Sequence, residues 1–166
     1  MKAGVKRLNE VEFTRRVKLN ARKLYCVAYS ILWNDADCAD AMQDAVAKVW
    51  QHRDRLRDES SFDSYLVRAL INRCKSMRRP RRFKSVELTD ELTADEGNMP
   101  ADIDLRDALK SLSEKYRLPL ILHYQDGFSI KEISDMLRLN ESLVKSRLHQ
   151  ARTRLKRLLG GDSYET

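Results

Sequence analysis

Several patterns that define other protein classes are missing from this 166-residue sequence. No apolar run approaches the ~20 residues that a membrane-spanning helix needs, and the first residues, MKAGVKRLNE, lack the apolar core of a secretory signal. The N-terminal half contains no useful length of alternating apolar and polar residues, so no strand is expected there. These absences predict a helical protein that stays in the cytoplasm and does not insert into a membrane.

Cysteine and histidine are also scarce, with three of each. Cys26, Cys38 and Cys74 are an odd number, lie far apart and form no C-x-x-C pair, so reduced structural thiols are expected. The histidines have no metal-ligand spacing, and no acid cluster suggests a two-metal site; they are His52, His123 and His149. We therefore expect no catalytic residue, no metal and no cofactor. A nucleic-acid-processing enzyme is the weaker alternative, which magnesium-dependent cleavage would revive.

Positive charge, by contrast, is plentiful: 32 Lys and Arg against 25 Asp and Glu give a net charge of +7. This charge favours a polyanionic partner, although an acidic membrane surface would attract it too. One basic run has eight cations and no acid, namely Arg68, Arg73, Lys75, Arg78, Arg79, Arg81, Arg82 and Lys84. The aromatic residues Trp50, Tyr65 and Phe83 either stack unpaired bases beside this run or belong to the core. Both readings stay open.

Apolar residues recur about every 3.6 positions in three stretches of the N-terminal half, which predicts three helices. The first runs from Phe13 to Trp33, with an inward stripe of Phe13, Val17, Ala21, Leu24, Tyr25, Ala28 and Leu32. The second is capped within 34–37; it turns Met42, Ala45, Val46, Val49 and Trp50 inward, and Asp40, Gln43, Asp44 and Lys48 outward. After a polar loop, the third runs from Phe62 to Arg79 and ends at Pro80; it packs through Phe62, Leu66, Ala69, Leu70, Cys74 and Met77.

The following segment, 84–104, inverts the charge, with seven acids, Gly97, Pro100 and no clear period. This composition predicts a flexible acidic linker. Order resumes at Leu105, and Ser113 is expected to cap a helix that covers 116–124. Gly127 then ends that helix.

A helix-turn-helix is predicted in the rest of the chain. Ser129 with Glu132 three residues on matches a capping box, so one helix starts at Ile130. After a turn at 138–139, Asn140 caps a basic helix whose inward stripe is Val144, Leu148, Ala151, Leu155 and Leu158. Between these positions lie donors for phosphates and base edges in a major groove: Lys145, Ser146, Arg147, His149, Gln150, Arg152 and Arg154. A basic helix is often only a solvated face, but two capped helices joined by a short turn favour DNA binding.

These motifs resemble two regions of bacterial sigma factors of the sigma-70 family, most closely the extracytoplasmic-function (ECF) group. The N-terminal half resembles region two in the order Leu24-Tyr25, Ala28-Tyr29, Asp40-Ala41-Met42-Gln43-Asp44, Trp50, Ser61-Phe62, Tyr65-Leu66 and Asn72. The C-terminal half is similar to region four through Leu112-Ser113-Glu114-Lys115-Tyr116-Arg117, Ser129 to Ile133, and Val144-Lys145-Ser146-Arg147-Leu148-His149-Gln150-Ala151-Arg152.

The resemblance implies an all-α fold of two small helical domains, 1–83 and 105–160, joined by the acidic linker 84–104. The first would bind polymerase and recognise and melt the minus-ten element, and the second would recognise the minus-thirty-five element. The chain would be a non-enzymatic factor that binds core RNA polymerase through the β′ clamp helices and the β flap, and directs it to promoter DNA. A separate anti-sigma factor is a further implied partner.

Three residue sets follow from the resemblance. Core polymerase contacts are expected at Asp40, Gln43, Asp44 and Lys48. Minus-ten contacts are expected at Arg68, Asn72, Arg73, Lys75, Arg78 and Arg79, with Asn72 near a flipped base. Minus-thirty-five contacts are expected at Lys145, Ser146, Arg147, His149, Gln150 and Arg152.

The sequence departs from the family pattern at three positions. Arg138 stands in the turn where the family often has glycine, Asn140 stands where proline is common, and Ser76 replaces a frequent acid. Arg138 is expected to strain the turn slightly. A duplex-only repressor or activator is the other alternative, because it would use the same C-terminal half. Unlike a sigma factor, it would usually dimerise and would need no single-strand site.

Overall fold

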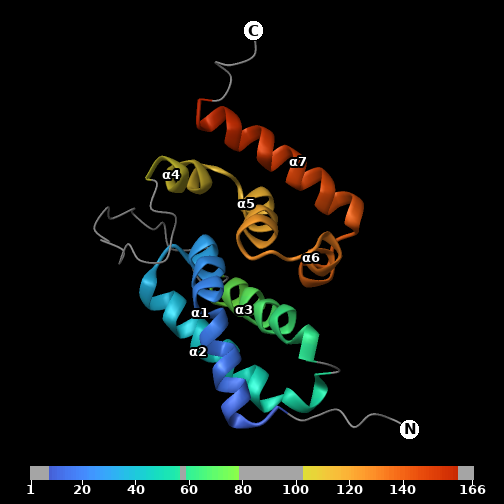
Figure 1. The fold of residues 1–166 in the computed structure, drawn as a ribbon. Helices are drawn as coiled ribbons and strands as arrows, with labels where there is room; N and C mark the ends of the chain where they lie inside the picture. The colour runs from blue at the N-terminus through green and yellow to red at the C-terminus, as the bar shows by residue number, and fades with distance from the viewer. Residues whose placement is uncertain (1–7, 57–58, 79–102, 161–166) are drawn as a thin grey trace. The chain divides into compact units, whose positions relative to one another are not determined.

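The computed structural model describes residues 8–56, 59–78 and 103–160. Within these residues every regular element is helical, which confirms the all-α prediction. The chain divides into two compact units, Met1–Asp90 and Glu91–Thr166 (Figure 1). The end of the basic run, from Arg79 to Lys84, and the predicted linker up to residue 102 lie outside the described residues.

The N-terminal unit is built from three helices that all contact one another, α1 (Glu10–Leu32), α2 (Asp35–Gln51) and α3 (Phe62–Arg78). Two short 3-10 turns, η1 (Arg53–Arg55) and η2 (Glu59–Ser61), lie in the stretch predicted to be a loop. The Phe13 ring of α1 lies 4.9 Å from the Trp50 ring of α2 and 5.6 Å from the Phe62 ring of α3. These edge-to-face contacts join all three helices.

The start of α2 lies within the stretch predicted to cap it, 34–37. The side chain of Asn34 accepts a hydrogen bond of 2.9 Å from the backbone N–H of Asp37, which satisfies an otherwise unpaired donor of the first turn. Trp33, just before it, adopts the left-handed conformation with φ 53° and ends α1. The residue that ends α1, Trp33, is therefore followed directly by the residue that caps the start of α2, Asn34.

The inward stripe predicted for α1 is partly wrong. Ala21 is exposed, and Val17, Tyr25 and Leu32 are only half-buried. The buried set is Phe13, Asn20, Leu24, Cys26, Val27, Ala28, Ser30 and Ile31. Because α1 packs against both α2 and α3, its buried arc is wider than one apolar stripe and includes polar side chains whose hydrogen bonds are satisfied inside. Ser30, for example, donates to the carbonyl oxygen of Val27 at 2.7 Å.

The helices α2 and α3 deviate in the same way. In α2, Met42, Val46 and Trp50 are half-buried rather than buried, and Cys38 and Ala41 join Ala45 and Val49 in the core. In α3, Ala69 and Met77 are half-buried, and Val67 and Ile71 are buried instead. Each helix contacts two neighbours, so a single stripe underestimates the width of its buried face.

The C-terminal unit contains α4 (Ile103–Ser111), α5 (Glu114–Leu120), the π-helical turn η4 (Ile121–Gln125), α6 (Ile130–Leu137) and α7 (Glu141–Leu158). Helix α4 begins two residues before the predicted boundary at residue 105. The helix predicted over 116–124 is divided between α5 and η4, and Asp126 donates its N–H to the Ile121 carbonyl five residues back at 3.1 Å. Gly127, with φ 77°, ends this segment as predicted.

One buried cluster of this unit lies between α4, α5 and α7, and consists of Leu109, Leu112, Tyr116, Leu120 and Ala151. Val144, Leu148 and Ala151 of the predicted α7 stripe are buried, and Leu155 packs partly against the core. Leu158 was predicted to point inward, but it is 50% exposed. It lies in the last turn of α7, one turn beyond Leu155, where the core cluster ends.

Arg117 of α5 is a buried cation that the sequence pattern did not predict. Its Nη1 donates to the carbonyl oxygen of Leu112 at 2.5 Å, and lies 3.4 and 3.5 Å from those of Leu109 and Lys110. These carbonyls belong to the C-terminal end of α4, where backbone acceptors lack helical partners and the helix dipole is negative. The guanidinium therefore caps α4 and joins it to α5.

The turn between α6 and α7 carries the strain expected at Arg138. This residue has φ 55° and ψ 47°, the left-handed conformation, which costs a residue with a Cβ about 1–2 kcal/mol. Its N–H donates to the Ser134 carbonyl and so ends α6. The backbone geometry there suits glycine better than arginine.

We expect Arg138→Gly to stabilise the C-terminal unit by about 0.5–1 kcal/mol, because relief of the strain exceeds the added entropy cost of glycine. Thermal unfolding followed by circular dichroism should show a midpoint a few degrees higher. Arg138→Ala is the matched control, since it removes the same side chain but keeps the Cβ. Equal midpoints for the two variants would contradict a backbone origin.

Candidate nucleic-acid interface

The helix-turn-helix is held by side-chain caps at both helix starts. In α6, Ser129 Oγ accepts from the Glu132 N–H at 3.1 Å, and the Glu132 carboxylate accepts from the Ser129 N–H at 2.7 Å. This reciprocal pair is the predicted capping box. In α7, Asn140 Oδ1 accepts from the Leu143 N–H at 2.7 Å, as predicted. The turn between them is tied by Ser134, whose hydroxyl donates to the Leu139 carbonyl at 2.6 Å. These hydrogen bonds fix the starts of α6 and α7 and the turn between them.

The polar face of α7 carries the residues predicted to meet a minus-thirty-five element. Lys145, Ser146, His149, Gln150 and Arg152 are exposed, and Arg147 is half-buried. An open depression of about 400 Å³ follows this face and is lined by His149, Gln150, Thr153, Arg154 and Arg157. Arg157 was not predicted to be a site residue, although its spacing of seven from Gln150 places it on the same side of the helix.

Two tyrosines from the preceding segment hold side chains of this face. The Tyr116 hydroxyl donates to Gln150 Oε1 at 2.9 Å, and Gln150 Nε2 donates to Ser146 Oγ at 3.2 Å. Arg152 Nη1 donates to the Tyr124 hydroxyl at 2.5 Å. Residues from α5 and η4 therefore fix the orientation of part of the predicted reading surface.

The helix α3 divides the predicted minus-ten residues between two sides. Arg68, Asn72 and Lys75 follow the spacing i, i+4, i+7 and share one side, on which Asn72 is exposed and the two cations are half-buried. Arg73 lies about 100° around the helix, and its Nε contacts Asp44 Oδ2 of α2 at 2.7 Å. Arg78 is exposed, and Arg79 lies outside the described residues.

The outward face of α2 contains the four predicted polymerase contacts. Asp40, Gln43, Asp44 and Lys48 are all exposed. The ion pair of Asp44 with Arg73 links this face to α3, and both side chains stay about half accessible, at 51% and 42%. One cation of the predicted minus-ten set is therefore directed toward the predicted polymerase-binding face.

Comparison with known families matches both units. The family described as sigma-70 region 2 matches residues 16–83, and the family described as sigma-70, region 4 matches residues 102–155. The RNA polymerase sigma factor SigZ of Bacillus subtilis is 34% identical over 128 residues, which cover 74% of this chain and 72% of SigZ. The ECF RNA polymerase sigma factor SigM of Mycobacterium tuberculosis is 28% identical over 151 residues, or 89% and 77% of the two chains. This chain belongs to the ECF group of the sigma-70 family.

A solved structure agrees with the assignment of this chain to the ECF sigma factors. The sigma factor RpoE of Bartonella quintana, solved in complex with the anti-sigma factor NepR, matches with a TM-score of 0.74 and 28% sequence identity. The match covers 91% of this chain and 98% of that chain. The resemblance found in the sequence is thereby confirmed, and the ECF sigma factor serves transcription initiation by RNA polymerase.

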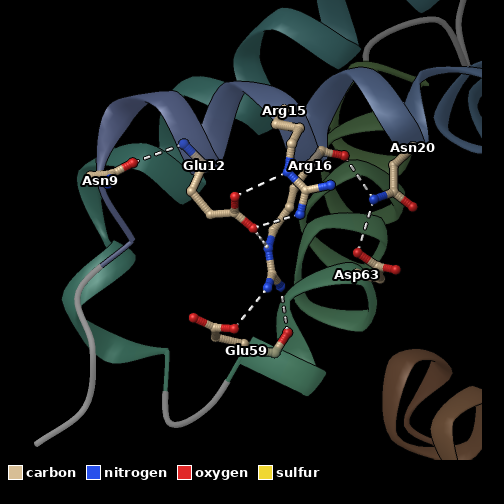
Figure 2. Close-up of polar contacts among 7 residues, drawn as sticks. All are labelled: Asn9, Glu12, Arg15, Arg16, Asn20, Glu59 and Asp63. Carbon is tan, nitrogen blue, oxygen red and sulfur yellow. Dashed lines mark hydrogen bonds and ion pairs between the residues drawn. The ribbon is translucent and has the colours of Figure 1, made fainter.

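Region two of the sigma factor contains a polar cluster that positions the start of α3 (Figure 2). The Arg16 guanidinium of α1 donates to the backbone carbonyl of Glu59 at 2.8 Å and to its carboxylate at 3.0 Å. Buried Asn20 donates to Asp63 Oδ1 at 2.8 Å. Hydrogen bonds from Arg15 and from Arg16 lower the pKa of Glu12 to about 2, so this carboxylate stays charged beside Arg16. Sequence reasoning missed this cluster, and its local signals are the pairs of Glu12 with Arg15 at spacing i, i+3 and with Arg16 at spacing i, i+4.

The aromatic residues near the basic run can now be placed. Trp50 is half-buried, contacts Phe13 and has the Arg53 guanidinium 3.9 Å from its ring centroid. Its ring therefore packs against Phe13 and Arg53 but is not fully buried in the core. Tyr65 is half-buried on α3, and Phe83 lies outside the described residues.

Region four also carries an apolar groove, which borders the polar face of α7 at Arg152. It has a volume of about 420 Å³ and is lined by Leu105, Leu109, Leu120, Ile121, Tyr124, Gln125, Arg152 and Leu155. Tyr124 remains 57% exposed at this groove. Over the described residues, no cluster of three or more His, Cys, Asp or Glu side chains could hold a metal ion. No helix in the same residues is long and apolar enough to cross a membrane.

Proposed function

We propose that this sigma factor reads a minus-thirty-five element with α7, captures and helps melt a minus-ten element with α3, and so directs core polymerase to specific promoters. The observation that carries this proposal is the exposed, donor-rich face of a helix whose start is fixed by a capping box, a tied turn and an asparagine cap. Such a second helix enters the major groove in helix-turn-helix proteins. The minus-thirty-five set is Lys145, Ser146, Arg147, His149, Gln150 and Arg152.

The minus-ten assignment is supported by the chemistry of α3. The exposed amide of Asn72 has donors and an acceptor for the edge of an unstacked base, and Arg68 and Lys75 on the same side suit the flanking phosphates. Arg73 and Arg78 are proposed as outer phosphate contacts, Arg73 at the expense of its ion pair with Asp44. Region two would act over 1–83 and region four over 105–160, with 84–104 as the connecting segment.

In vitro transcription with a bacterial core polymerase and a promoter library tests the whole proposal. The wild-type chain should select templates with two shared motifs near minus ten and minus thirty-five. Transcripts that start without motif selection would reject promoter recognition by this chain. A footprint on duplex promoter DNA without polymerase would instead support the duplex-only regulator.

We expect Lys145→Ala and Arg147→Ala to weaken binding of the holoenzyme to minus-thirty-five DNA. A lost base contact should cost about 1–3 kcal/mol at one position, whereas a lost phosphate contact should reduce the salt dependence by about one unit of slope. Binding titrations at several salt concentrations measure both quantities. Lys110→Ala on α4 is the charge-matched control in the same unit. Unchanged affinity in both α7 variants would refute this reading surface.

The polymerase contact is proposed for the outward face of α2, against the β′ clamp helices. Asp40, Gln43, Asp44 and Lys48 offer donors, acceptors and both charge signs without an exposed apolar patch, which suits a partner that must also dissociate. The apolar groove of region four is the proposed contact for the β flap, because it can bury apolar side chains from a partner.

We expect Asp44→Arg to lower the affinity for core polymerase about tenfold or more, or about 1.4 kcal/mol. Because Asp44 forms an ion pair with Arg73, exchanging the two charges separates a contact with polymerase from an effect within the sigma factor. If Asp44 itself contacts polymerase, Asp44→Arg with Arg73→Asp restores the internal pair but not the affinity. Full recovery in the double variant would show that the single change acted only through repulsion within the sigma factor.

A separate anti-sigma factor is proposed to hold the chain inactive. The likeness to an RpoE solved with NepR supports this, as do two functional units that one partner could cover together. Joined contacts would strengthen such binding through effective concentration. A pull-down from native lysate with the intact chain and each half tests it. Recovery of core polymerase alone, with no excess activity on overexpression, would argue against sequestration.

A further inference from the structure

Leu143 is an exposed apolar residue in the first turn of α7, on the side of the helix that carries the polar face. It is the third residue of the helix, and its backbone N–H donates to the Asn140 side chain that caps α7. Its neighbour Val144 is fully buried, whereas Leu143 is 37% exposed and lies outside the buried stripe of this helix. The cap therefore fixes the backbone position of a leucine that is not part of the core.

Leu143 shares its side of α7 with two residues of the proposed minus-thirty-five set. Ser146 and Gln150 follow it at spacings of three and seven residues, which places all three in one row along the helix. All three are exposed, and Gln150 Nε2 donates to Ser146 Oγ at 3.2 Å. Leu143 lies at the N-terminal end of this row. Because the N-terminal residues of the second helix contact base edges in helix-turn-helix proteins, Leu143 lies where such a contact is expected.

A leucine side chain suits one chemical group of the major groove. It has no hydrogen-bond donor or acceptor, so it cannot pair with the polar atoms of a base edge. Thymine alone presents an apolar group there, its C5 methyl, and apolar side chains contact this methyl. Over another base, the leucine would displace water from polar atoms without replacing its hydrogen bonds, which costs free energy. The side chain therefore favours thymine at the base pair that it covers.

We propose that Leu143 is a specificity-determining residue of region four, which contacts the C5 methyl of one thymine in the minus-thirty-five element. The inference rests on the proposed function, in which α7 reads this element in the major groove. It adds an apolar contact to a set that was selected for charge and hydrogen-bonding groups. Burial of one methyl group corresponds to about a fourfold difference in affinity, so the contact gives a measurable preference at one base pair.

Replacement of single thymines by uracil tests this contact, because uracil lacks only the C5 methyl and keeps its base pairing. The full-length chain is assembled with core polymerase, and selection from a randomised library identifies the minus-thirty-five element. Each thymine of this element, on either strand, is then replaced in turn. We expect one replacement to lower the affinity of the wild-type holoenzyme about fourfold. Leu143→Ala should bind the thymine promoter more weakly than the wild type and should not respond to uracil at that position.

A matched variant and a converse base change separate the methyl contact from structural effects. Leu158→Ala removes the same atoms from another exposed leucine, in the last turn of α7, and should keep the wild-type response to uracil. Cytosine at the sensitive position should weaken wild-type binding, and 5-methylcytosine, which adds only the methyl, should recover part of the loss. Leu143→Ala should not distinguish the two cytosines. Each comparison is made within one variant, so a change in its stability does not affect the result.

Three outcomes would overturn the proposal. It is wrong if no single uracil in the minus-thirty-five element weakens wild-type binding, if Leu143→Ala keeps the full response to uracil, or if Leu158→Ala loses it equally. Failure of the proposed function looks different, because the wild-type holoenzyme would then select no minus-thirty-five sequence at all.

Discussion

Replacing Arg117 with methionine is expected to destabilise region four strongly and to leave the stability of region two unchanged. The guanidinium is only 6% exposed and donates to backbone carbonyls at the end of α4. Methionine fills a similar volume but donates no hydrogen bond, so the buried carbonyl of Leu112 would lose the donor that lies 2.5 Å from it. Leaving a buried acceptor without its donor costs about 1–3 kcal/mol, and hydrogen bonds to charged groups lie at the upper end of this range. Small domains are stable by only about 5–15 kcal/mol, so this loss removes a sizeable part of the stability of the unit.

Hydrogen exchange of the intact chain measures this effect unit by unit. Peptides from α4 to α7 should exchange faster in Arg117→Met than in the wild type, whereas peptides from α1 to α3 should keep their wild-type protection. Arg157→Met is the matched control, because Arg157 is exposed on α7 and its replacement should change stability by less than about 0.5 kcal/mol. Wild-type protection of α4 in Arg117→Met would mean that the cap contributes little.

Local signals predicted much of the fold. The caps at Asn34, Ser129 and Asn140 depend on side chains that bond to backbone within three residues, so the sequence contains both partners. The same holds for Arg138 and Gly127, where the chain must adopt positive φ. Such features need no knowledge of how distant segments pack. Ser129, Asn140 and Gly127 were predicted by residue, the cap of α2 only within 34–37, and the strain at Arg138 from the family resemblance.

Contacts between distant residues could not be predicted in this way. Arg16 bonds to Glu59 and Asn20 to Asp63 across 43 residues, and Asp44 pairs with Arg73 across 29. Hydrophobic periodicity assigns polar residues to the outside, so it placed neither Asn20 nor Arg117 in the core. Burial of a polar side chain depends on whether packing brings a partner to it, and that information lies in the tertiary structure.

The same limit applies to the candidate site. Residue type and helical spacing selected the exposed face of α7 correctly as a surface, but they treated its side chains as equivalent donors. All four of Lys145, His149, Gln150 and Arg152 are exposed, but the structure distinguishes them, because Gln150 is held by Tyr116 and Arg152 by Tyr124. In α3, the ion pair likewise distinguishes Arg73 from Arg68 and Asn72. What each side chain can offer to DNA follows from its partners within the protein.

Asn72→Ala is expected to slow promoter opening by about ten- to a hundredfold while changing duplex binding by less than about threefold. The amide of Asn72 is exposed on α3, and its proposed partner is the edge of a base that has left the stack. That edge is not accessible in closed duplex DNA, so the side chain stabilises only the opened state. The loss of one good base contact, about 1–3 kcal/mol, sets the expected size.

A promoter with a premelted minus-ten region separates opening from binding. Because unpairing costs a few kcal/mol, a template that is already open should rescue part of the loss in Asn72→Ala. Ser76→Ala, which removes another small exposed polar group one turn later on α3, should open both templates at the wild-type rate. If Asn72→Ala is equally defective on duplex and premelted templates, its side chain contributes to affinity for DNA in general, and the flipped base must be held by other residues of region two.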